Sequence, residues 1–242
     1  SSGAAAFACV GDDKQLSATV QTRDAQALGL GESLFERLLK SGVCSHGDGF
    51  FQLDVQRRMH SNLAVFPSAM FYHGEVLTGI DDAERPPIPG IEWPCEGRCR
   101  MLFVDCAGRP GVAQQAKGTS LENPGEANLV VAALCWFLGA SALAGEDLSV
   151  AAITGYSAQR AVLEQRVKLG LRGRAYGAGG VRVGTVDGFQ GMERDLVLVS
   201  TVRSGQCGEV GFLRDPRRVN VLLTRARRGL VVFGSRKNFW GG

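Results

Sequence analysis

Lysine is scarce in this chain, because only five occur among its 242 residues and none of them follows a glycine. The sequence therefore lacks the G-x-x-x-x-G-K-[ST] loop, in which backbone amides and a lysine cradle the β- and γ-phosphates of a nucleotide. The acidic pair that holds magnesium beside such a loop is likewise not expected, because the sequence begins only about ten residues before the cluster Gly11–Leu16. Without these parts, the chain alone is not expected to hydrolyse a nucleoside triphosphate.

Signals for metal binding and for a membrane span are also weak. The histidines lie at positions 46, 60 and 73, and the pair Cys95 and Cys99 has no second cysteine pair at zinc spacing. The seven cysteines are scattered and accompany no signal-peptide pattern, which favours reduced thiols inside a cell and no metal site. Residues 129–144 are uncharged but fall short of the roughly 20 apolar residues of a membrane span, so a buried helix and no membrane contact are expected.

Hydrophobic residues make up 45% of the chain, which is enough for the core of one large α/β domain. The apolar runs predict strands at 7–11, 50–54, 101–105, 148–153, 181–187, 195–201 and 230–234. Helices are predicted at 31–42, 61–72, from about 125 onward, and at 157–168. This alternation predicts a mostly parallel sheet with helices on both faces. The proline- and glycine-rich stretch near 79–118 predicts a surface excursion.

The net charge of +3 hides an asymmetry between the two parts of the chain. Residues 1–155 carry 11 basic and 18 acidic side chains, whereas residues 156–242 carry 16 and 6. The basic part indicates a localised contact with a polyanion such as a nucleotide or a nucleic acid. Five arginines are expected on one short helix that begins at the N-cap Asp215 and stops at Gly229, with Arg218 and Arg225 on one face: Arg217, Arg218, Arg225, Arg227 and Arg228.

Four further polar clusters follow predicted strands. They are Gly11–Leu16 with Gln15, Gln56–His60 with Arg57 and Arg58, Ile153–Gln159 with Thr154 and Tyr156, and Thr185–Glu193 with Asp187, Gln190 and Gly191. In open parallel sheets ligands bind at the carboxyl ends of strands, so these clusters are expected to meet there. A glutamine can sense a γ-phosphate, arginines can clamp phosphates, a tyrosine can stack on a base, and Glu193 can accept a hydrogen bond from a ribose hydroxyl.

Each cluster taken alone has an ordinary alternative. The arginines also fit a solvated basic face or a surface pair, Gln15 fits a loop amide that bonds to the backbone, and Tyr156 fits a core residue. A single short glycine-rich loop is a weak indication of nucleotide contact. All five clusters in this order favour a nucleotide site together with a nucleic-acid path.

The segments GDDKQL, QRRMH, ITGYSAQ, TVDGFQGMERD and RRVNVLLTRARRG resemble, in order and spacing, the motifs of superfamily 1 helicases from the third motif to the last. SLFERLLKSG, AVFPSAMFYHG, IEWP and GFLRDPRRVNV are most similar to the up-frameshift RNA helicases of nonsense-mediated mRNA decay, with the senataxin-like RNA/DNA helicases as the alternative. The resemblance spans nearly the whole chain. It implies a second RecA-like helicase domain at 31–242, preceded at 1–30 by the tail of the first RecA-like domain and an interdomain segment.

The resemblance also implies roles for individual residues. Gln15 would be the γ-phosphate sensor, Arg58 and Arg225 would contact the γ-phosphate, and Arg225 would be the arginine finger. Glu193 would contact the ribose, with Arg57 and the backbone at Gly191 beside the nucleotide. Five residues would lie on or beside the path of single-stranded RNA: Thr154, Tyr156, Thr185, Asp187 and Gln190.

Some positions depart from the family pattern. Arg57 stands where the family usually has tyrosine, so adenine would have to stack on a guanidinium plane. Ala18, Ser61 and Gly155 replace prolines, which predicts looser loops around the motifs.

For the intact protein, the resemblance implies ATP as cofactor, with the magnesium ligands on a missing N-terminal RecA-like domain. It implies single-stranded RNA and mRNA decay factors as partners, 5′ to 3′ movement, and a cytoplasmic location, with a nuclear location as the alternative. The chain would then be one domain of an ATP-dependent helicase, inactive until the first domain is supplied.

Two other functions remain open. One is a catalytically inactive RNA- or protein-binding adaptor derived from a helicase, for which RNA affinity depends on salt and never on nucleotide. The other is a stand-alone α/β enzyme on a small phosphorylated substrate, in which Asp54, His60 or Asp187 would converge as acid and base. No acid–base spacing in the sequence supports the second of these.

Overall fold

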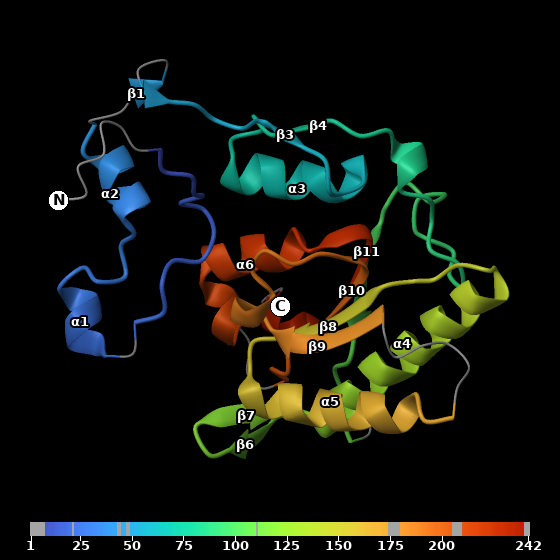
Figure 1. The fold of residues 1–242 in the computed structure, drawn as a ribbon. Helices are drawn as coiled ribbons and strands as arrows, with labels where there is room; N and C mark the ends of the chain where they lie inside the picture. The colour runs from blue at the N-terminus through green and yellow to red at the C-terminus, as the bar shows by residue number, and fades with distance from the viewer. Residues whose placement is uncertain are drawn as a thin grey trace.

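The computed structural model describes residues 8–20, 22–42, 45–46, 49–109, 111–173, 180–204 and 210–239. At its centre is a five-stranded parallel sheet in the order β5-β11-β10-β8-β9. Its strands are β5 (Met101–Asp105), β8 (Val150–Thr154), β9 (Val181–Thr185), β10 (Arg194–Ser200) and β11 (Ala226–Gly234). Helices cover both faces of this sheet, as Figure 1 shows, which confirms the predicted α/β fold.

Two pairs of helices enclose the sheet. Helices α4 (Pro124–Leu143) and α5 (Ser157–Gly170) lie on one face, and α3 (Ser61–Phe71) and α6 (Pro216–Leu223) lie on the other (Figure 1). The short helix α7 (Arg236–Phe239) follows β11. The predicted helices near 61–72, 125 and 157–168 are confirmed. They start where the sequence provides caps, since the Asn123 side chain accepts from the backbone N–H of Glu126 and Pro124 takes the first helical position.

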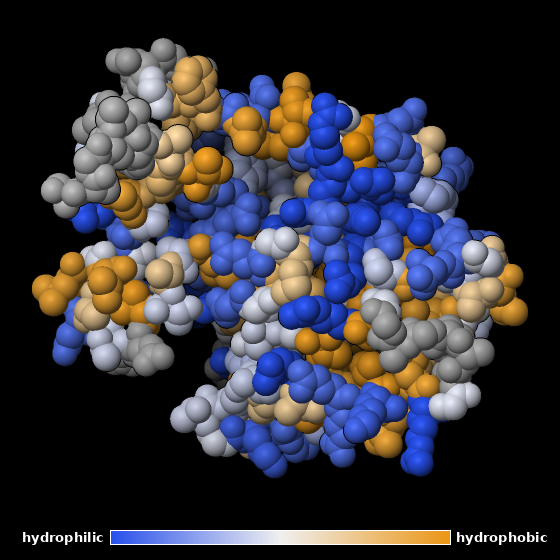
Figure 2. Space-filling view, viewed as in Figure 1, coloured by the Kyte–Doolittle hydropathy of each residue, from blue (hydrophilic) through white to orange (hydrophobic). Residues whose placement is uncertain are grey.

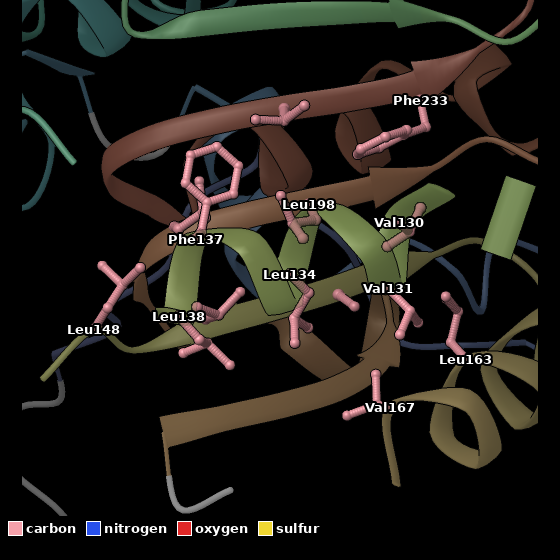
Figure 3. Packing of buried hydrophobic residues seen from close by; sticks show 14 of the residues in the cluster. Val130, Val131, Leu134, Phe137, Leu138, Leu148, Leu163, Val167, Leu198 and Phe233 are labelled. Atoms are coloured by element: carbon pink, nitrogen blue, oxygen red, sulfur yellow. The ribbon is translucent and has the colours of Figure 1, made fainter. Parts of the chain in front are cut away.

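The strands bury both of their faces, because successive side chains point to opposite sides of the sheet. In β10, Leu196 and Leu198 pack in the core under α4 and α5, whereas Val197 and Val199 pack in the core under α3 and α6. Figure 3 shows the first of these cores, where Leu134 of α4 lies close to Leu198. Continuous apolar runs, rather than alternating ones, are the sequence pattern that such a doubly covered sheet requires.

The N-terminal part lies to one side of the sheet and contains α1 (Arg23–Ala27) and α2 (Leu34–Lys40) (Figure 1). The strand predicted at 7–11 is wrong for its described residues, because Val10 is 89% exposed and residues 8–11 form no strand. Phe7 lies outside the described residues. A strand forms only where a neighbour accepts and donates its backbone hydrogen bonds, and no described strand runs beside residues 8–11.

Two small ladders replace the strand predicted at 50–54. Strand β2 (Gly49–Phe50) pairs with β1 (Ser45–His46), and β3 (Val55–Gln56) pairs with β4 (Leu77–Thr78). The apolar residues between β2 and β3 are exposed, with Leu53 at 87%. Their apolar character alone therefore gave the wrong position for the strand.

The stretch near 79–118 is only partly a surface excursion. It contains the 3₁₀ turn η1 (Asp82–Glu84), and Ile88 and Trp93 are 1% and 4% exposed in the core beneath α4. Further on, β6 (Gln115–Lys117) forms a hairpin with β7 (Ser120–Glu122). Ile88 and Trp93 lie in irregular, proline-rich backbone, so no helical or strand periodicity in the sequence indicates that they are buried.

Helix α4 is, by length and composition alone, the one helix of the described chain that is apolar enough to cross a membrane. Its most apolar window is 44% buried. One side of α4 packs on the sheet through Val130, Leu134 and Leu138, while Trp136 on the other side is 65% exposed. The buried side agrees with the predicted core helix.

The predicted arginine helix is too long. Helix α6 ends at Leu223, and the backbone N–H of Thr224 closes its last turn on Asn220. Strand β11 starts at Ala226, so Arg227 and Arg228 belong to the sheet and Arg225 lies in the junction. Tertiary pairing of β11 with β5 and β10 overrides the helical pattern, and Arg218 and Arg225 do not share a helix face.

A candidate nucleotide and nucleic-acid site

Arg225 is the largest side chain that is fully buried, at 1% exposure. Its Nε donates to the carbonyl of Val221 at 2.8 Å, one terminal nitrogen to the carbonyl of Met192 at 3.3 Å, and the other to Oγ1 of Thr224 at 2.7 Å. The guanidinium is therefore held rigidly at the junction between α6 and β11.

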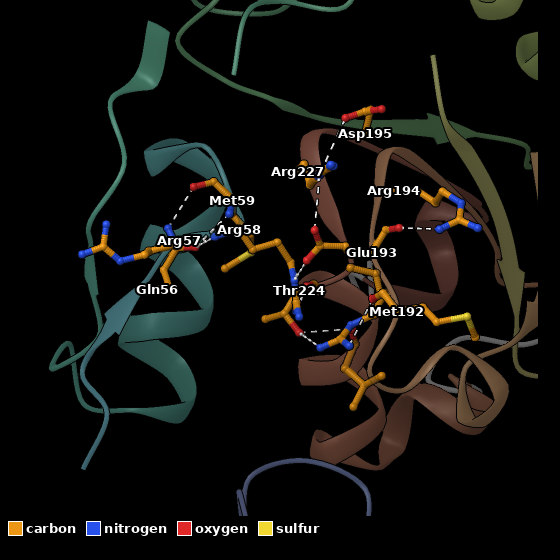
Figure 4. A network of polar contacts seen from close by, with 12 residues as sticks. Gln56, Arg57, Arg58, Met59, Met192, Glu193, Arg194, Asp195, Thr224 and Arg227 are labelled. Atoms are coloured by element: carbon orange, nitrogen blue, oxygen red, sulfur yellow. Dashed lines mark hydrogen bonds and ion pairs between the residues drawn. The ribbon is translucent and has the colours of Figure 1, made fainter. Parts of the chain in front are cut away.

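Arg58 reaches the same junction from a segment 167 positions earlier in the sequence. Its Nε donates to Oε2 of Glu193 at 2.6 Å, and a terminal nitrogen donates to the carbonyl of Thr224 at 2.8 Å. The side chain of Gln56 fixes the backbone beside it, since Oε1 of Gln56 accepts from the N–H of Arg58 at 2.9 Å. Figure 4 shows Arg58 extending toward Glu193 and Thr224.

The two arginines are close enough to affect one another electrostatically. Burial, together with the positive charge of Arg58, lowers the pKa of Arg225 to about 10, against Tyr72, Glu193 and Asp12, which raise it. Two cations held together with so little water around one of them attract an anion. The structure thus places Arg58 and Arg225 side by side, as the sequence analysis predicts.

Glu193 also takes part in a row of ion pairs on the side that faces away from Arg58. Nε of Arg227 lies 3.5 Å from Oε1 of Glu193 and 3.8 Å from Oδ1 of Asp195. Oδ2 of Asp195 then accepts from Oγ of Ser149 at 2.5 Å. Glu193 is therefore anchored from both sides, and Figure 4 shows this order of contacts.

Gln15 lies on the segment that packs beside α6. Its Nε2 donates to Oδ2 of Asp12 at 2.6 Å, and the hydroxyl of Tyr72 donates to the same oxygen at 2.7 Å. Nδ2 of Asn220 binds both the carbonyl of Lys14 and the Tyr72 oxygen. The hydrogen bonds of Asp12 and Tyr72 therefore hold the predicted sensor, Gln15, near Arg58 and Arg225.

Tyr72 and Asn220 are functional candidates that sequence reasoning missed. Burial, together with the nearby Asp12 carboxylate, raises the pKa of Tyr72 to about 12, so its hydroxyl remains a donor near neutral pH. Tyr72 ends α3 and Asn220 lies inside α6, and neither follows a strand. The available signal was the spacing of Asn220, which is five residues before Arg225 in the most basic cluster.

The site residues occupy both ends of the sheet, which corrects the expectation that all lie at carboxyl ends. Glu193 and Arg225 directly precede β10 and β11, so they lie at the amino ends of these strands. Thr154 and Thr185 pair at the carboxyl ends of β8 and β9. The segment between Thr185 and Arg194 must cross the sheet because β9 and β10 are parallel. The rule for open parallel sheets therefore describes only the second group.

The predicted nucleic-acid residues form a looser group. Tyr156 is half-buried and meets the Phe212 ring edge-on at 5.6 Å, while its hydroxyl accepts from Nε of Arg203 at 2.9 Å. Thr154 is fully buried, so it lies beneath the surface. Arg203 is a further basic candidate that the sequence analysis did not single out.

The other residues of this group are more exposed. Oγ1 of Thr185 accepts from the N–H of Gly188, and Asp187 lies 3.4 Å from Arg218. Nε2 of Gln190 donates to the carbonyl of Leu16 at 3.1 Å, which connects this loop to the Gln15 segment. Asp187 is therefore paired with Arg218 at the surface of this group.

Arg57 and Gly191 lie at the periphery of the nucleotide group. Arg57 is exposed and donates to the carbonyl of Gly79 at 3.0 Å. Gly191 is exposed with φ of 79°, a left-handed conformation that favours glycine and turns the chain ahead of Glu193.

Gly155 and Ser61 stand where prolines were expected. Close packing at the first and a hydrogen bond at the second take the place of the proline ring. A Cβ at Gly155 would lie 2.2 Å from the Phe212 ring, so a side chain here would displace that ring. Oγ of Ser61 donates to Asp82 at 2.5 Å at the start of α3. Both positions therefore make contacts of their own, and the looser loops stay a prediction.

A buried carboxyl group lies beneath the carboxyl end of β10, where Ser200 is the last residue of the strand. Glu126 is fully buried, and its Oε1 accepts from Oγ of Ser200 at 2.6 Å and from the N–H of Val202 at 2.8 Å. Burial raises its pKa to about 7 despite these hydrogen bonds. Val202 has a φ of 68°, a strained conformation for a β-branched residue, and Glu126 holds it in place.

The described residues offer no group of three histidine, cysteine, aspartate or glutamate side chains that could hold a metal ion. Asp54, His60 and Asp187 likewise form no acid–base group, since His60 pairs with Asp82 at 3.7 Å and Asp187 with Arg218. The cations held together at this site are the guanidinium groups of Arg58 and Arg225, whose donors bond to carbonyl, hydroxyl and carboxylate groups of the chain.

Taken together, a five-stranded parallel sheet covered on both faces, with arginines held at its amino end, defines a domain of the α/β class. Residues 30–237 match the family model described as AAA domain (AAA_12), and the chain belongs to that family. The chain is 38% identical over 237 residues to the Regulator of nonsense transcripts 1 homolog of Drosophila melanogaster, covering 97% of this chain and 19% of the relative. It is 38% identical over 236 residues to the ATP-dependent helicase NAM7 of Saccharomyces cerevisiae, covering 96% and 23%.

The chain spans about a fifth of the length of the curated relatives that it matches. Among solved structures, the C-terminal domain of a possible DNA helicase from a Lactobacillus strain superposes with a TM-score of 0.40 at 13% identity, covering 74% of this chain and 88% of that one. That likeness is too weak to carry an argument.

Proposed function

We propose that this chain is the C-terminal RecA-like half of an ATP-dependent RNA helicase. In this proposal Arg58 and Arg225 neutralise the γ-phosphate, Gln15 senses it, and Glu193 accepts from the ribose. The observation that carries the proposal is the convergence of Arg58, Arg225 and Glu193 from three separate segments on the α6–β11 junction.

The proposed mechanism is electrostatic. A phosphoryl group in transfer spreads negative charge over its equatorial oxygens, and rigid guanidinium groups stabilise that charge without reorganising. Arg225 meets this requirement because three hydrogen bonds fix it before any ligand arrives. Magnesium and the phosphate cradle would come from an N-terminal RecA-like domain, so no magnesium ligand is proposed in this chain.

Closure of the two domains would require one local exchange. Arg58 donates to Glu193 in the present structure, so it must turn toward the γ-phosphate while Glu193 turns toward the ribose. ATP itself offers both new partners, which makes the exchange a consequence of nucleotide binding.

The nucleic-acid part of the proposal assigns single-stranded RNA to the carboxyl end of the sheet. Tyr156, Thr185, Asp187 and Gln190 would border the strand, with Thr154 beneath it. The basic C-terminal part of the chain supports a polyanion there. Decay factors as partners, 5′ to 3′ movement and a cytoplasmic location, with the nuclear alternative, belong to the same proposal.

The test compares ATP hydrolysis by this chain and by a longer protein that supplies the first RecA-like domain, both with saturating single-stranded RNA. We expect turnover only from the longer protein, and its RNA affinity should change when a non-hydrolysable ATP analogue is added. Turnover by this chain alone would contradict the division of the site. RNA affinity that falls with salt but ignores nucleotide would instead indicate an inactive adaptor.

A further inference from the structure

Strand β9 forms one edge of the central sheet, and among the described strands it pairs only with β8. The N–H of Val186 donates to the carbonyl of Thr154 at 3.0 Å, which fixes the side of the strand that faces β8. Because backbone groups of successive strand residues point to alternate sides, Val181 and Val183 direct their N–H and C=O groups away from the sheet. The described residues provide no backbone partner for Val183 on that side. An unpaired edge of this kind is a template for another strand.

A groove of about 430 Å³ lies beside this edge, between β9 and the C-terminal half of α5. Its apolar lining comes from Val167 and Leu171 of α5 and from Val181 and Val183 of β9. Figure 2 shows apolar surface in the corner between α5 and β9, with hydrophilic residues of α5 below it. An extended chain beside β9 would place every second side chain over this apolar lining.

The rim of the groove is positively charged. Lys168 and Arg172 border it and are exposed, and neither has an ion-pair partner in the described part of the chain. The guanidinium of Arg182 instead lies over the ring of Phe189, which belongs to the core on the opposite face of the sheet. The single acid at the rim, Glu164, lies 3.7 Å from Arg160 and is offset by it. Two cations without ion-pair partners beside an apolar lining, Lys168 and Arg172, therefore complement a segment that carries both apolar and acidic residues.

We propose that this groove binds an acidic, extended segment of a partner protein, which adds to the central sheet as a strand beside β9. Backbone hydrogen bonds would supply affinity, and the apolar lining with its basic rim would supply specificity for alternating apolar and acidic residues. RNA fits less well because no aromatic side chain lines the groove to stack on a base. The proposal is independent of the nucleotide site.

The first experiment measures binding of a fluorescent ten-residue peptide of alternating valine and glutamate to this chain by anisotropy. We expect saturable binding, weakened at least tenfold by Lys168→Glu combined with Arg172→Glu. The matched control is Arg236→Glu combined with Lys237→Glu, which makes the same change of charge on exposed residues of α7 and should alter affinity less than twofold. Equal loss in both double variants would overturn the proposal, and thermal unfolding of each verifies its fold.

A second experiment separates strand addition from simple charge attraction. Peptides carrying N-methyl groups on alternate residues lose the backbone donors of one edge only. We expect one methylated series to lose binding and the other to keep it. Equal binding by both series would contradict pairing with β9.

Two further measurements test whether the groove binds RNA or a second copy of the chain instead of a peptide. If a twelve-residue single-stranded RNA lost affinity in Lys168→Glu/Arg172→Glu as strongly as the peptide, the surface would bind nucleic acid and the proposal would be wrong. If sedimentation showed that the wild-type chain dimerises and this double variant does not, the occupant would be a second copy, which also overturns the proposal. A monomeric chain whose RNA affinity is unchanged by the double variant supports it.

Discussion

Nε of Arg58 lies 2.6 Å from a carboxylate oxygen of Glu193, so the arginine proposed for the γ-phosphate and the carboxylate proposed for the ribose neutralise each other before nucleotide binds. Their two sequence positions, 135 residues apart, belong to different clusters with different predicted roles. The contact suggests that neither role can be altered without affecting the other.

Glu193→Gln is expected to raise the KM for ATP about tenfold in the longer protein, because the loss of a charged acceptor typically costs 1.5–3 kcal/mol. The same change should reduce the preference for ATP over 2′,3′-dideoxy-ATP toward one. Steady-state kinetics with both nucleotides measure this. Glu164→Gln, on exposed α5, is the control, and an unchanged nucleotide preference in Glu193→Gln would refute the ribose contact.

Arg225→Lys should reduce ATP hydrolysis by at least about 10³-fold, because a single ammonium cannot reproduce the planar donor array of a guanidinium. RNA affinity should stay within about twofold, since Arg225 lies at the opposite end of the sheet from Thr154 and Thr185. Single-turnover hydrolysis and anisotropy with labelled RNA provide the two readouts. Because Arg225 is buried, thermal unfolding must show that the variant is folded. Surviving hydrolysis with lost RNA affinity would reverse the assignment.

Tyr72→Phe removes the hydroxyl that joins Asp12 to Asn220. Loss of these bonds should destabilise the domain by about 1–2 kcal/mol and speed amide exchange at residues 12–16. Denaturant unfolding and hydrogen exchange measure both effects. The control is Tyr156→Phe, which removes a hydroxyl at the other end of the sheet. Unchanged exchange at residues 12–16 in Tyr72→Phe would show that other contacts hold this segment.

Glu126 should make the stability of the chain depend on pH. Its pKa rises from 4.5 to about 7 on folding, so the folded state favours the protonated form, and this contribution to stability is complete below pH 4.5. It declines as the pH rises toward 7 and is constant above that, for a total of about 3 kcal/mol.

Glu126→Gln keeps an oxygen that can accept from Ser200 and Val202 but cannot ionise. The variant should therefore gain stability relative to the wild type between pH 5 and pH 8, measured by urea unfolding at a series of pH values. The other titrating groups cancel in this difference. A difference that does not vary with pH would show that Glu126 is not protonated in the folded chain.

The central strands and most helices were predictable because doubly buried strands read as continuous apolar runs, as in DLVLVS of β10. The junction at Arg225 was not, because LLTRARRG carries a helical pattern that only pairing with β5 and β10 converts into a strand. The same limit applies to residues 8–11, whose apolar side chains find no neighbouring strand. Local pattern predicts an element only where its tertiary partners are present.

The proximity of Arg58 and Arg225 was expected from the resemblance to superfamily 1 helicases, which assigns both residues to one phosphate group. Their location at the amino end of the sheet was not predicted. The rule that ligands bind at the carboxyl ends of strands says nothing about loops that run the length of the sheet. Tyr72 and Asn220 were not predicted because they lie at the end of one ordinary helix and inside another. Their importance depends on hydrogen bonds that lead to Asp12, which is far away in the sequence.

The crossing between Thr185 and Arg194 has a mechanical consequence. It leads from the carboxyl end of β9 to the amino end of β10, whose seven residues measure about 20 Å, within one uninterrupted stretch of backbone. In the middle of this segment the Gln190 side chain donates to the carbonyl of Leu16. At its far end Glu193 accepts a hydrogen bond from Arg58. A displacement at the Thr185 end would therefore reach Glu193 along one short backbone segment, which Val186 and Phe189 anchor in the core.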